Sequence, residues 1–258
     1  MTAVLFVSHL INERYLERYL KLYNNLKGQY DVYWLFQTDN GISDFTLREH
    51  DINVAGFTLD NLNELHYSPI GEHIIPGSVH FIIEHFYHMH PEYDYYWIIE
   101  YDVVFTGDWA YFIGEFTKSD ADMIASYIEF RCEQNANWKW WDSLTFAAND
   151  KADIKRHVKA FTPIYRISNR ALNFIDGFLK RPGNMGHCEA IIPTALYNNG
   201  FHIEDIGGTG EFVAPDCHNR FYVQDASINR CTIRWRPTIH PEDIETFCLP
   251  NKLFHPVK

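Results

Sequence analysis

The chain has 258 residues, with 22 Lys and Arg against 34 Asp and Glu, a formal net charge of −12 and 46% hydrophobic residues. At about 150 residues per domain, this length allows one large domain with a sizeable core. Nucleic-acid binding depends on Lys and Arg neutralising phosphates, so this charge excludes nucleic acid as a first expectation. A divalent cation held by carboxylates would still let an acidic protein bind a small phosphorylated ligand.

The cysteines and the first residues of the sequence indicate a reducing compartment of the cell. The five cysteines are widely spaced and form no C-x-x-C pair, which indicates thiols rather than a disulfide framework. The opening residues, MTAVLFVSHLINERY, lack the basic start and apolar core of a signal peptide. No stretch approaches the ~18 apolar residues of a membrane helix. We therefore expect a cytoplasmic protein without a transmembrane segment, at most peripheral at the inner face of the membrane.

The first forty residues predict a strand, a helix and a second strand. Residues 3–7 are apolar and rich in β-branched and aromatic types, as in a strand buried on both faces. Residues 11–26 carry apolar side chains at helical spacing, and Gly28 is placed to end this helix. Residues 31–39 predict a strand that ends in the turn Asp39-Asn40-Gly41. The order βαβ predicts a parallel sheet.

The rest of the chain continues this alternation without a repeat or a low-complexity linker. Further strands are predicted at 52–58, 95–105, 121–130, 161–168 and 201–205, and helices at 77–90, 169–179 and 188–200. We expect a single α/β domain with an open mixed, mostly parallel sheet flanked by helices.

Two carboxylates interrupt the most apolar predicted strand, YYWIIEYDVVF. Glu100 and Asp102 are two residues apart, so both would point to one face of a regular strand. Ligands bind at the carboxyl ends of strands in open α/β sheets, and paired carboxylates there suit Mg²⁺ or Mn²⁺. The alternative is structural: Asp102 would cap a turn and Glu100 would pair with an arginine.

An aromatic-rich strand ending in acid-x-Asp after a βαβ opening resembles the D-x-D element of GT-A fold glycosyltransferases. The segments YDYYWIIEYDVVFTGDW, FTPIYRISNRAL, GHCEAIIPT, IEDIGG and KLFHPVK are also similar to those of a little-studied bacterial and fungal family, whose glycosyltransferase activity is inferred largely from its fold. They span residues 93 to 258. Glu100 replaces the first Asp of the usual pattern, which makes Asp102 the safer ligand.

The resemblance implies a nucleotide-sugar donor, UDP-linked, whose two phosphates are bridged by Mn²⁺ or Mg²⁺. It implies that residues 1–105 bind the nucleotide and residues 106–258 the acceptor, a glycan or a lipid-linked sugar. Asp102, Glu100 and His255 would be the metal ligands, and Lys258 could reach a phosphate. The alternative for His255 is an ordinary tail histidine.

Glu189 is the predicted catalytic base. It begins a predicted helix in GHCEAIIPT, which is similar to the S-P-D-E segment that carries the base in core-2-type N-acetylglucosaminyltransferases. An inverting enzyme needs such a carboxylate to take the proton of the acceptor hydroxyl, whereas a retaining enzyme does not. A glutamate in the first turn also simply favours the helix dipole. Asp205, next to Glu204, is the second catalytic candidate.

Ser8, His9 and Asp39 end the first two predicted strands, where GT-A enzymes usually contact the base and ribose. Any βα loop would place polar residues there, so their alternative is ordinary loop chemistry.

Other features of the sequence can be explained either by ligand binding or by a structural role. The tryptophans of NANWKWWDSL could stack on a sugar face or fold onto the core. Arg234 and Arg236 could meet an anionic ligand or pair with surplus acids. Residues 206–210, IGGTG, match no phosphate-binding fingerprint, so we expect a flexible loop. Four histidines of the 77–90 helix have no H-E-x-x-H pattern, so we expect surface and packing roles for them rather than a zinc site: His80, His85, His88 and His90.

The sequence thus favours a metal-dependent glycosyltransferase that inverts configuration. Two alternatives remain: a metal-dependent phosphoester hydrolase or nucleotidyltransferase using the same carboxylates, and a non-catalytic glycan-binding module built on the tryptophans.

Overall fold

The structure is a computed structural model that describes residues 1–39, 52–74, 77–224 and 230–258. Its main sheet has seven strands in the order β3-β2-β1-β4-β7-β6-β8. They are β1 (Thr2–Ser8), β2 (Asp31–Gln37), β3 (Val54–Phe57), β4 (Tyr95–Glu100), β6 (Met123–Phe130), β7 (Val158–Ser168) and β8 (Ile203–Asp205). Only β7 runs antiparallel to its neighbours, β4 and β6. The predicted open, mixed and mostly parallel α/β sheet is confirmed.

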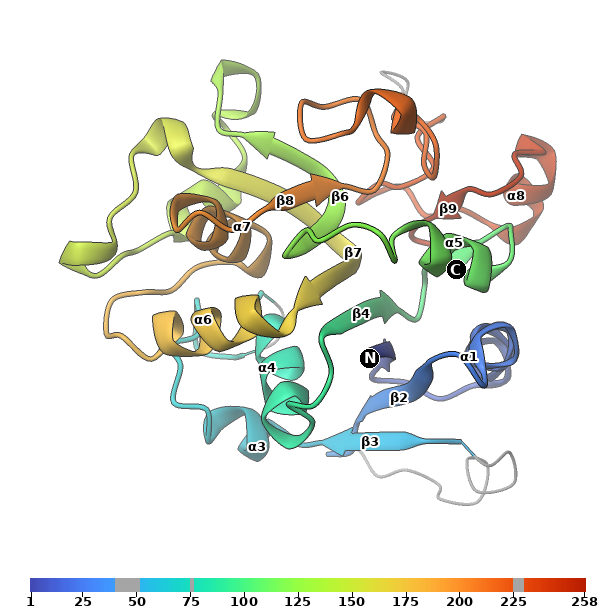
Figure 1. The fold of residues 1–258 in the computed structure, drawn as a ribbon, viewed down its shortest axis with the longest axis horizontal. Coiled ribbons are helices and arrows are strands. Elements are labelled where there is room, and N and C mark those ends of the chain that lie inside the picture. Colours follow the sequence, from blue (N-terminus) through green and yellow to red (C-terminus); the bar gives the residue numbers. More distant parts are fainter. Residues whose placement is uncertain (40–51, 75–76, 225–229) are drawn as a thin grey trace.

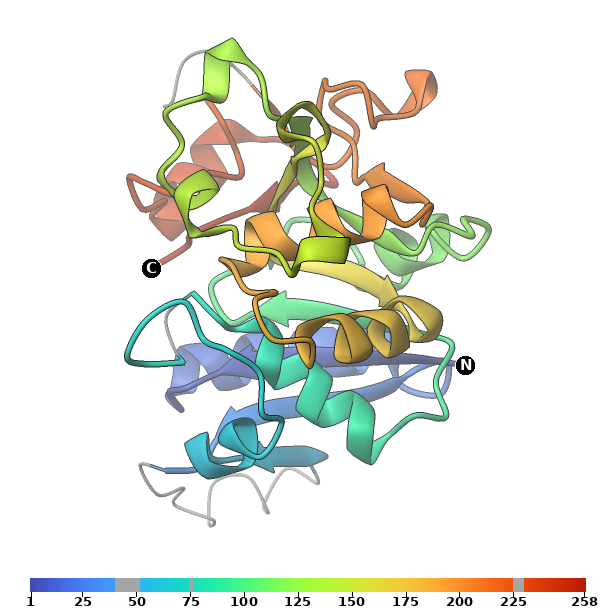
Figure 2. The ribbon, with the colours of Figure 1, turned by 90° about the vertical axis from the view of Figure 1, so that its left-hand side faces the viewer.

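Helices cover both faces of this sheet, as Figures 1 and 2 show. They are α1 (Glu13–Leu26), α3 (Leu59–Asn63), α4 (His80–Met89), α5 (Trp109–Glu115), α6 (Asn169–Leu179), α7 (Cys188–Asn198) and α8 (Pro241–Phe247). α1 and α5 pack on one face, and α4, α6 and α7 on the other. Within the described residues, no helix is both long and apolar enough to cross a membrane.

The side chains of β1 alternate between two hydrophobic cores, one on each face of the sheet. Ala3 and Leu5 pack with α4 and α6, whereas Val4 and Phe6 pack with α1, and all four are at most 2% exposed. Successive side chains of a strand point to opposite faces, so a strand covered on both sides must be apolar throughout. The apolar run that predicted this strand is therefore its physical cause.

The predicted helix after β1 is confirmed and begins at a cap. Asn12 is the N-cap, and its side chain accepts a hydrogen bond from the backbone N–H of Tyr15. The apolar positions at helical spacing face the sheet, and Gly28 follows the helix with a φ of +82°. Of the turn predicted after β2, Asn40 and Gly41 lie outside the described residues.

The predicted strand 95–105 is wrong in one respect, because it is two strands joined by a turn. β4 ends at Glu100, residues 101–103 turn, and β5 (Val104–Phe105) leaves the main sheet. The backbone N–H of Val103 closes this turn on the carbonyl of Glu100 at 3.0 Å. Asp102 therefore lies in a turn beyond the strand end, and the argument from a regular strand does not explain where its side chain points.

A second, two-stranded sheet brings the last residues of the chain to this turn. β5 pairs antiparallel with β9 (Leu253–Phe254), with Val104 opposite Phe254. The backbone N–H of Val257 then donates to the carbonyl of Asp102 at 2.9 Å. Both side chains of β9 are fully buried, so the segment that carries His255 is packed rather than a loose tail.

Candidate functional site

A cavity of ≈ 280 Å³ opens where four parallel strands end. Its lining includes the last residue of each strand, which are Ser8 of β1, Gln37 of β2, Phe57 of β3 and Glu100 of β4. Strand ends of an open α/β sheet are where such folds bind ligands, because the loops there diverge and leave a crevice. Apolar side chains such as Leu35, Ile82 and Ile98 line it together with these polar ones, as in sites that accept a ring with hydrogen-bonding edges.

Three predicted side chains meet beside this cavity. The Nε2 atom of His255 lies 3.4 Å from Oδ1 of Asp102 and 3.7 Å from Oε2 of Glu100. One ligand atom from each residue lies within 4.8 Å of the other two. Asp102 and His255 are buried, and 39% of the Glu100 side chain is exposed toward the cavity. The structure brings these residues together; their role as metal ligands stays a prediction.

The hydrogen bonding of His255 leaves one ring nitrogen facing the acids. Its Nδ1 lies 3.0 Å from the backbone carbonyl of Arg234, which can only accept, so Nδ1 carries the proton. In the neutral ring Nε2 then has a lone pair that faces two carboxylates. Metal-binding histidines typically donate their other N–H to a backbone carbonyl or a carboxylate in this way. The arrangement suits a cation between Nε2 and the carboxylates.

The pKa values of Glu100 and Asp102 are shifted in opposite directions. Burial, partly opposed by His255 and reinforced by Asp102, raises the pKa of Glu100 to about 7. Burial acts in the same direction on Asp102, but the proximity of His255 and the charge of Lys258 outweigh it, so the pKa of Asp102 is lowered. Lys258 contributes through its Nζ, 3.5 Å from Oδ2 of Asp102. The cluster therefore holds an ionised Asp102 beside a carboxyl group that ionises near neutral pH.

A second cavity, of ≈ 230 Å³, contains the predicted base. Glu189 lines it together with Trp138, Trp235 and Phe161. Phe161 is next in the chain to Thr162, which lines the first cavity, so both cavities reach the same part of β7. The Phe161 ring centre lies 5.2 Å from that of His255. The second cavity thus approaches the three-residue cluster through Phe161.

Glu189 is held at the start of α7 with its carboxylate nearly unpaired. His187 caps the helix, accepting from the backbone N–H of Glu189 at 3.3 Å. The carboxylate is 15% exposed, and it accepts a long hydrogen bond of 3.4 Å from the backbone N–H of Thr162. Burial raises the pKa of Glu189 to about 8. A carboxyl group that ionises near neutral pH and faces a cavity has the properties of a general base.

Asp205 is occupied by structural hydrogen bonds. It is 5% exposed and accepts from the backbone N–H groups of Ile128, Gly207 and Gly208. The hydroxyl of Tyr222 lies 2.9 Å from Oδ1 and 3.1 Å from Oδ2. Both oxygens therefore accept structural hydrogen bonds, Oδ1 from the glycine turn and Oδ2 from Ile128, and the role of Asp205 as a base stays a prediction.

Of the predicted nucleotide contacts, Ser8 and His9 line the first cavity. The Ser8 hydroxyl also accepts from the indole N–H of Trp34 at 2.7 Å, so it has a packing role as well. Asp39 accepts from the backbone N–H of Leu59, the first residue of α3, at 3.1 Å. Gln37, two residues earlier, is the polar side chain of β2 that lines the cavity.

The three tryptophans of the 135–144 segment have three different environments. Trp141 is 2% exposed and folds onto the core, and Trp140 stacks on His187 with ring centres 4.0 Å apart. Only Trp138 lines the second cavity, where Trp235 joins it. Trp235 is 71% exposed, and as a lone tryptophan between arginines it gave no sequence signal for this cavity.

Comparisons with known proteins give fold-level likeness only. No described protein family and no curated protein matches the chain. Similar solved structures include mouse xyloside xylosyltransferase 1, at 10% identity and a TM-score of 0.42 over 77% of this chain and 80% of that one. Another is glucosyl-3-phosphoglycerate synthase from Mycobacterium tuberculosis with Mn²⁺, UDP-glucose and phosphoglyceric acid, at 11% identity and 0.41 over 67% and 58%. A third, from Bacillus anthracis and provisionally described as a glucose-1-phosphate thymidylyltransferase, has 11% identity and 0.43 over 79% and 85%.

Proposed function

We propose that this chain is a metal-dependent glycosyltransferase that moves a sugar from a UDP-linked donor to a glycan or glycolipid acceptor with inversion of configuration. The observation that carries this proposal is the position of the Glu100, Asp102 and His255 cluster beside one cavity while Glu189 faces a second. An inverting transfer needs a donor site next to an acceptor site, positive charge for the leaving diphosphate and a base for the acceptor hydroxyl.

The residues of the cluster fit a divalent cation such as Mn²⁺ or Mg²⁺. Asp102 Oδ1 is buried and has no hydrogen-bond partner among the described residues, an arrangement that is costly unless a cation or proton compensates it. Asp102, Glu100 and His255 would hold the cation. When bound, it would neutralise the charge that develops on the leaving diphosphate. Lys258 adds a further positive charge next to Asp102.

Glu189 would take the proton of the acceptor hydroxyl as that oxygen attacks the anomeric carbon of the donor sugar. The new carbon–oxygen bond forms as the bond from the anomeric carbon to the diphosphate breaks, and the electron pair leaves with the diphosphate. Trp138 and Trp235 present indole rings to the same cavity, and such rings bind the apolar faces of sugars.

Thermal unfolding with and without cation tests the donor site. UDP with Mn²⁺ should raise the melting temperature of the parent chain, and UDP with a chelator should not, because a ligand that binds only the folded state stabilises it. Asp102→Asn should lose this rise. Asp120→Asn, whose carboxylate is 93% exposed, is the matched control and should keep it.

Thermal unfolding, together with an assay of nucleotide-sugar consumption, separates the alternative functions. Equal stabilisation of the Asp102→Asn and parent chains by UDP and Mn²⁺ would disprove the metal assignment. Stabilisation by an oligosaccharide alone, with no effect of nucleotide or metal, would indicate a glycan-binding module. Consumption of nucleotide-sugar at the same rate with and without every acceptor offered would indicate a hydrolase.

A further inference from the structure

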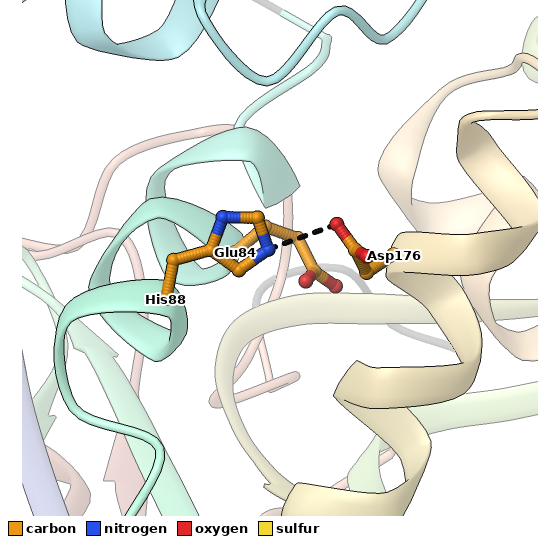
Figure 3. A group of neighbouring side chains, drawn as sticks. All are labelled: Glu84, His88 and Asp176. Atoms are coloured by element: carbon orange, nitrogen blue, oxygen red, sulfur yellow. Dashed lines mark hydrogen bonds and ion pairs between the residues drawn. The ribbon is translucent and has the colours of Figure 1, made fainter.

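A second group of potential metal ligands lies between α4 and α6, on the helical layer that covers the sheet. Glu84 and His88 are one turn apart on α4, so their side chains lie on the same side of that helix. Asp176 faces them from α6. One ligand atom from each of the three lies within 4.8 Å of the others, as Figure 3 shows.

One carboxylate oxygen of Glu84, the buried member of this group, is left without a hydrogen bond among the described residues. Glu84 is 1% exposed, and its Oε2 has no hydrogen-bond partner among the described residues. Figure 3 shows its carboxylate pointing from α4 across the helix–helix gap toward Asp176. Burying a carboxyl oxygen without a partner forfeits its hydration with nothing in return, so its position requires a compensating group.

The other two members are already oriented toward each other. His88 Nε2 lies 2.9 Å from Oδ1 of Asp176, which also accepts from the hydroxyl of Tyr67 at 2.6 Å. The Nζ of Lys180 donates a hydrogen bond to the second oxygen of Asp176, Oδ2, at 2.9 Å. The imidazole of His88 is 37% exposed, which gives solvent and ions access to the group.

We propose that Glu84, His88 and Asp176 form a second cation site, separate from the Asp102 cluster, that binds a transition-metal ion of the Zn²⁺ type and ties α4 to α6. One imidazole and two carboxylates are ligands that Zn²⁺ takes in proteins, and the Asp102 cluster, with the same ligand types, is expected to take up zinc as well. Water would complete the coordination at the exposed side. The competing explanation is a protonated Glu84 with no cation.

Zinc binding to the full chain tests this site. Protein stripped with a chelator would be equilibrated with ZnCl₂, and bound zinc and melting temperature measured for parent, His88→Ala and Glu84→Gln. Both variants should bind one fewer zinc per chain than the parent and lose the part of the zinc-dependent rise in melting temperature that the parent owes to this site. His85→Ala changes a histidine of the same helix that contributes no atom to the group, and should behave as the parent.

Asp102→Asn separates the two sites in the same experiment. It should keep the zinc that His88→Ala loses, whereas His88→Ala should keep the stabilisation by UDP and Mn²⁺. Equal zinc content in the parent, His88→Ala and Glu84→Gln chains would overturn the proposal and leave the protonated Glu84 as the explanation. This result would not affect the proposed transferase, because that activity is tested at Asp102.

Discussion

At the scale of single residues, the carboxyl groups near the two cavities differ in what compensates their burial. Asp102 has His255 and Lys258 beside it, whereas Glu189 has one long backbone hydrogen bond. The pKa of Asp102 is therefore lowered and that of Glu189 is raised to about 8. This difference separates a carboxylate that stays ionised from a carboxyl group that can exchange a proton near neutral pH.

The raised pKa of Glu189 predicts the pH dependence of turnover. A general base acts in its ionised form, so the turnover number should rise as the pH increases through about 8 and level off above it. Glu189→Gln should bind UDP and Mn²⁺ as the parent does but lose most transfer, about 10²-fold or more. Steady-state kinetics from pH 6 to pH 9, with binding measured in parallel, checks both. Near-normal turnover of Glu189→Gln would remove Glu189 from the mechanism.

The raised pKa of Glu189 also predicts that the free energy of unfolding falls as the pH rises. Between the ordinary pKa of 4.5 and the folded-state value of about 8, the unfolded chain ionises Glu189 and the folded chain does not. The parent should then lose up to about 1.4 kcal/mol of unfolding free energy per pH unit relative to Glu189→Gln, and nothing further above pH 8. Urea unfolding of both chains from pH 5 to pH 9 measures this. A difference independent of pH would show that Glu189 ionises normally.

At the scale of elements, buried polar contacts from β7 hold the irregular segment after α5. The guanidinium of Arg166, 3% exposed, donates to the carbonyls of Phe116, Ser119 and Ala121 at 2.6 to 2.9 Å. Its carbon Cζ also lies 4.1 Å from the centre of the Tyr95 ring. One planar side chain thus satisfies three carbonyls that lie outside any helix or strand.

Arg166→Lys should therefore destabilise the chain although it keeps the charge. An ammonium group cannot reproduce the planar fork, and each hydrogen bond to a charged group is worth about 1.5–3 kcal/mol, so we expect a loss of about 2 kcal/mol or more. Urea unfolding of Arg166→Lys and of Arg14→Lys, an exposed position on α1, provides the comparison. If both variants unfold at the same urea concentration as the parent, the three carbonyl contacts contribute nothing.

At the scale of the whole molecule, the cluster depends on the end of the chain returning to the sheet. β9 pairs with β5, Val257 donates to Asp102, and Arg18 of α1 donates to the carbonyls of Tyr101 and Val257. Segments from the beginning, middle and end of the chain therefore position one turn. A net charge of −12 makes a cation at this turn the means by which an acidic protein could attract a diphosphate.

Removal of residues 255–258 should abolish the stabilisation by UDP and Mn²⁺ and also lower the melting temperature without ligand, because the Asp102 turn loses its backbone partner. His255→Gln should abolish the first effect but keep most of the second, since the segment still packs. Thermal unfolding of the two chains separates ligand loss from loss of packing. A His255→Gln chain that still responds fully to UDP and Mn²⁺ would exclude His255 as a ligand.

The sequence by itself determined the acid pair, the strands of the main sheet and the helices α1, α4, α6 and α7, but it predicted no separate element at α3, α5, α8, β5 or β9. Alternating or continuous apolar runs predict β1 and β2, and helical spacing predicts α1, because these patterns follow from which faces are buried. The end of the central strand could be identified because two carboxylates interrupt an apolar run. Such signals are local, so they can be read within about ten residues.

Only the tertiary structure decided which distant side chains meet. The break between β4 and β5, the return of His255 to Asp102, the joining of Trp138 and Trp235, and the approach of Asp176 to Glu84 and His88 involve segments far apart in the chain. The spacing of Glu84 and His88 was visible in the sequence, but their partner on α6 was not. Contacts of this kind result from many weak packing interactions summed over the whole fold, and no local pattern encodes them.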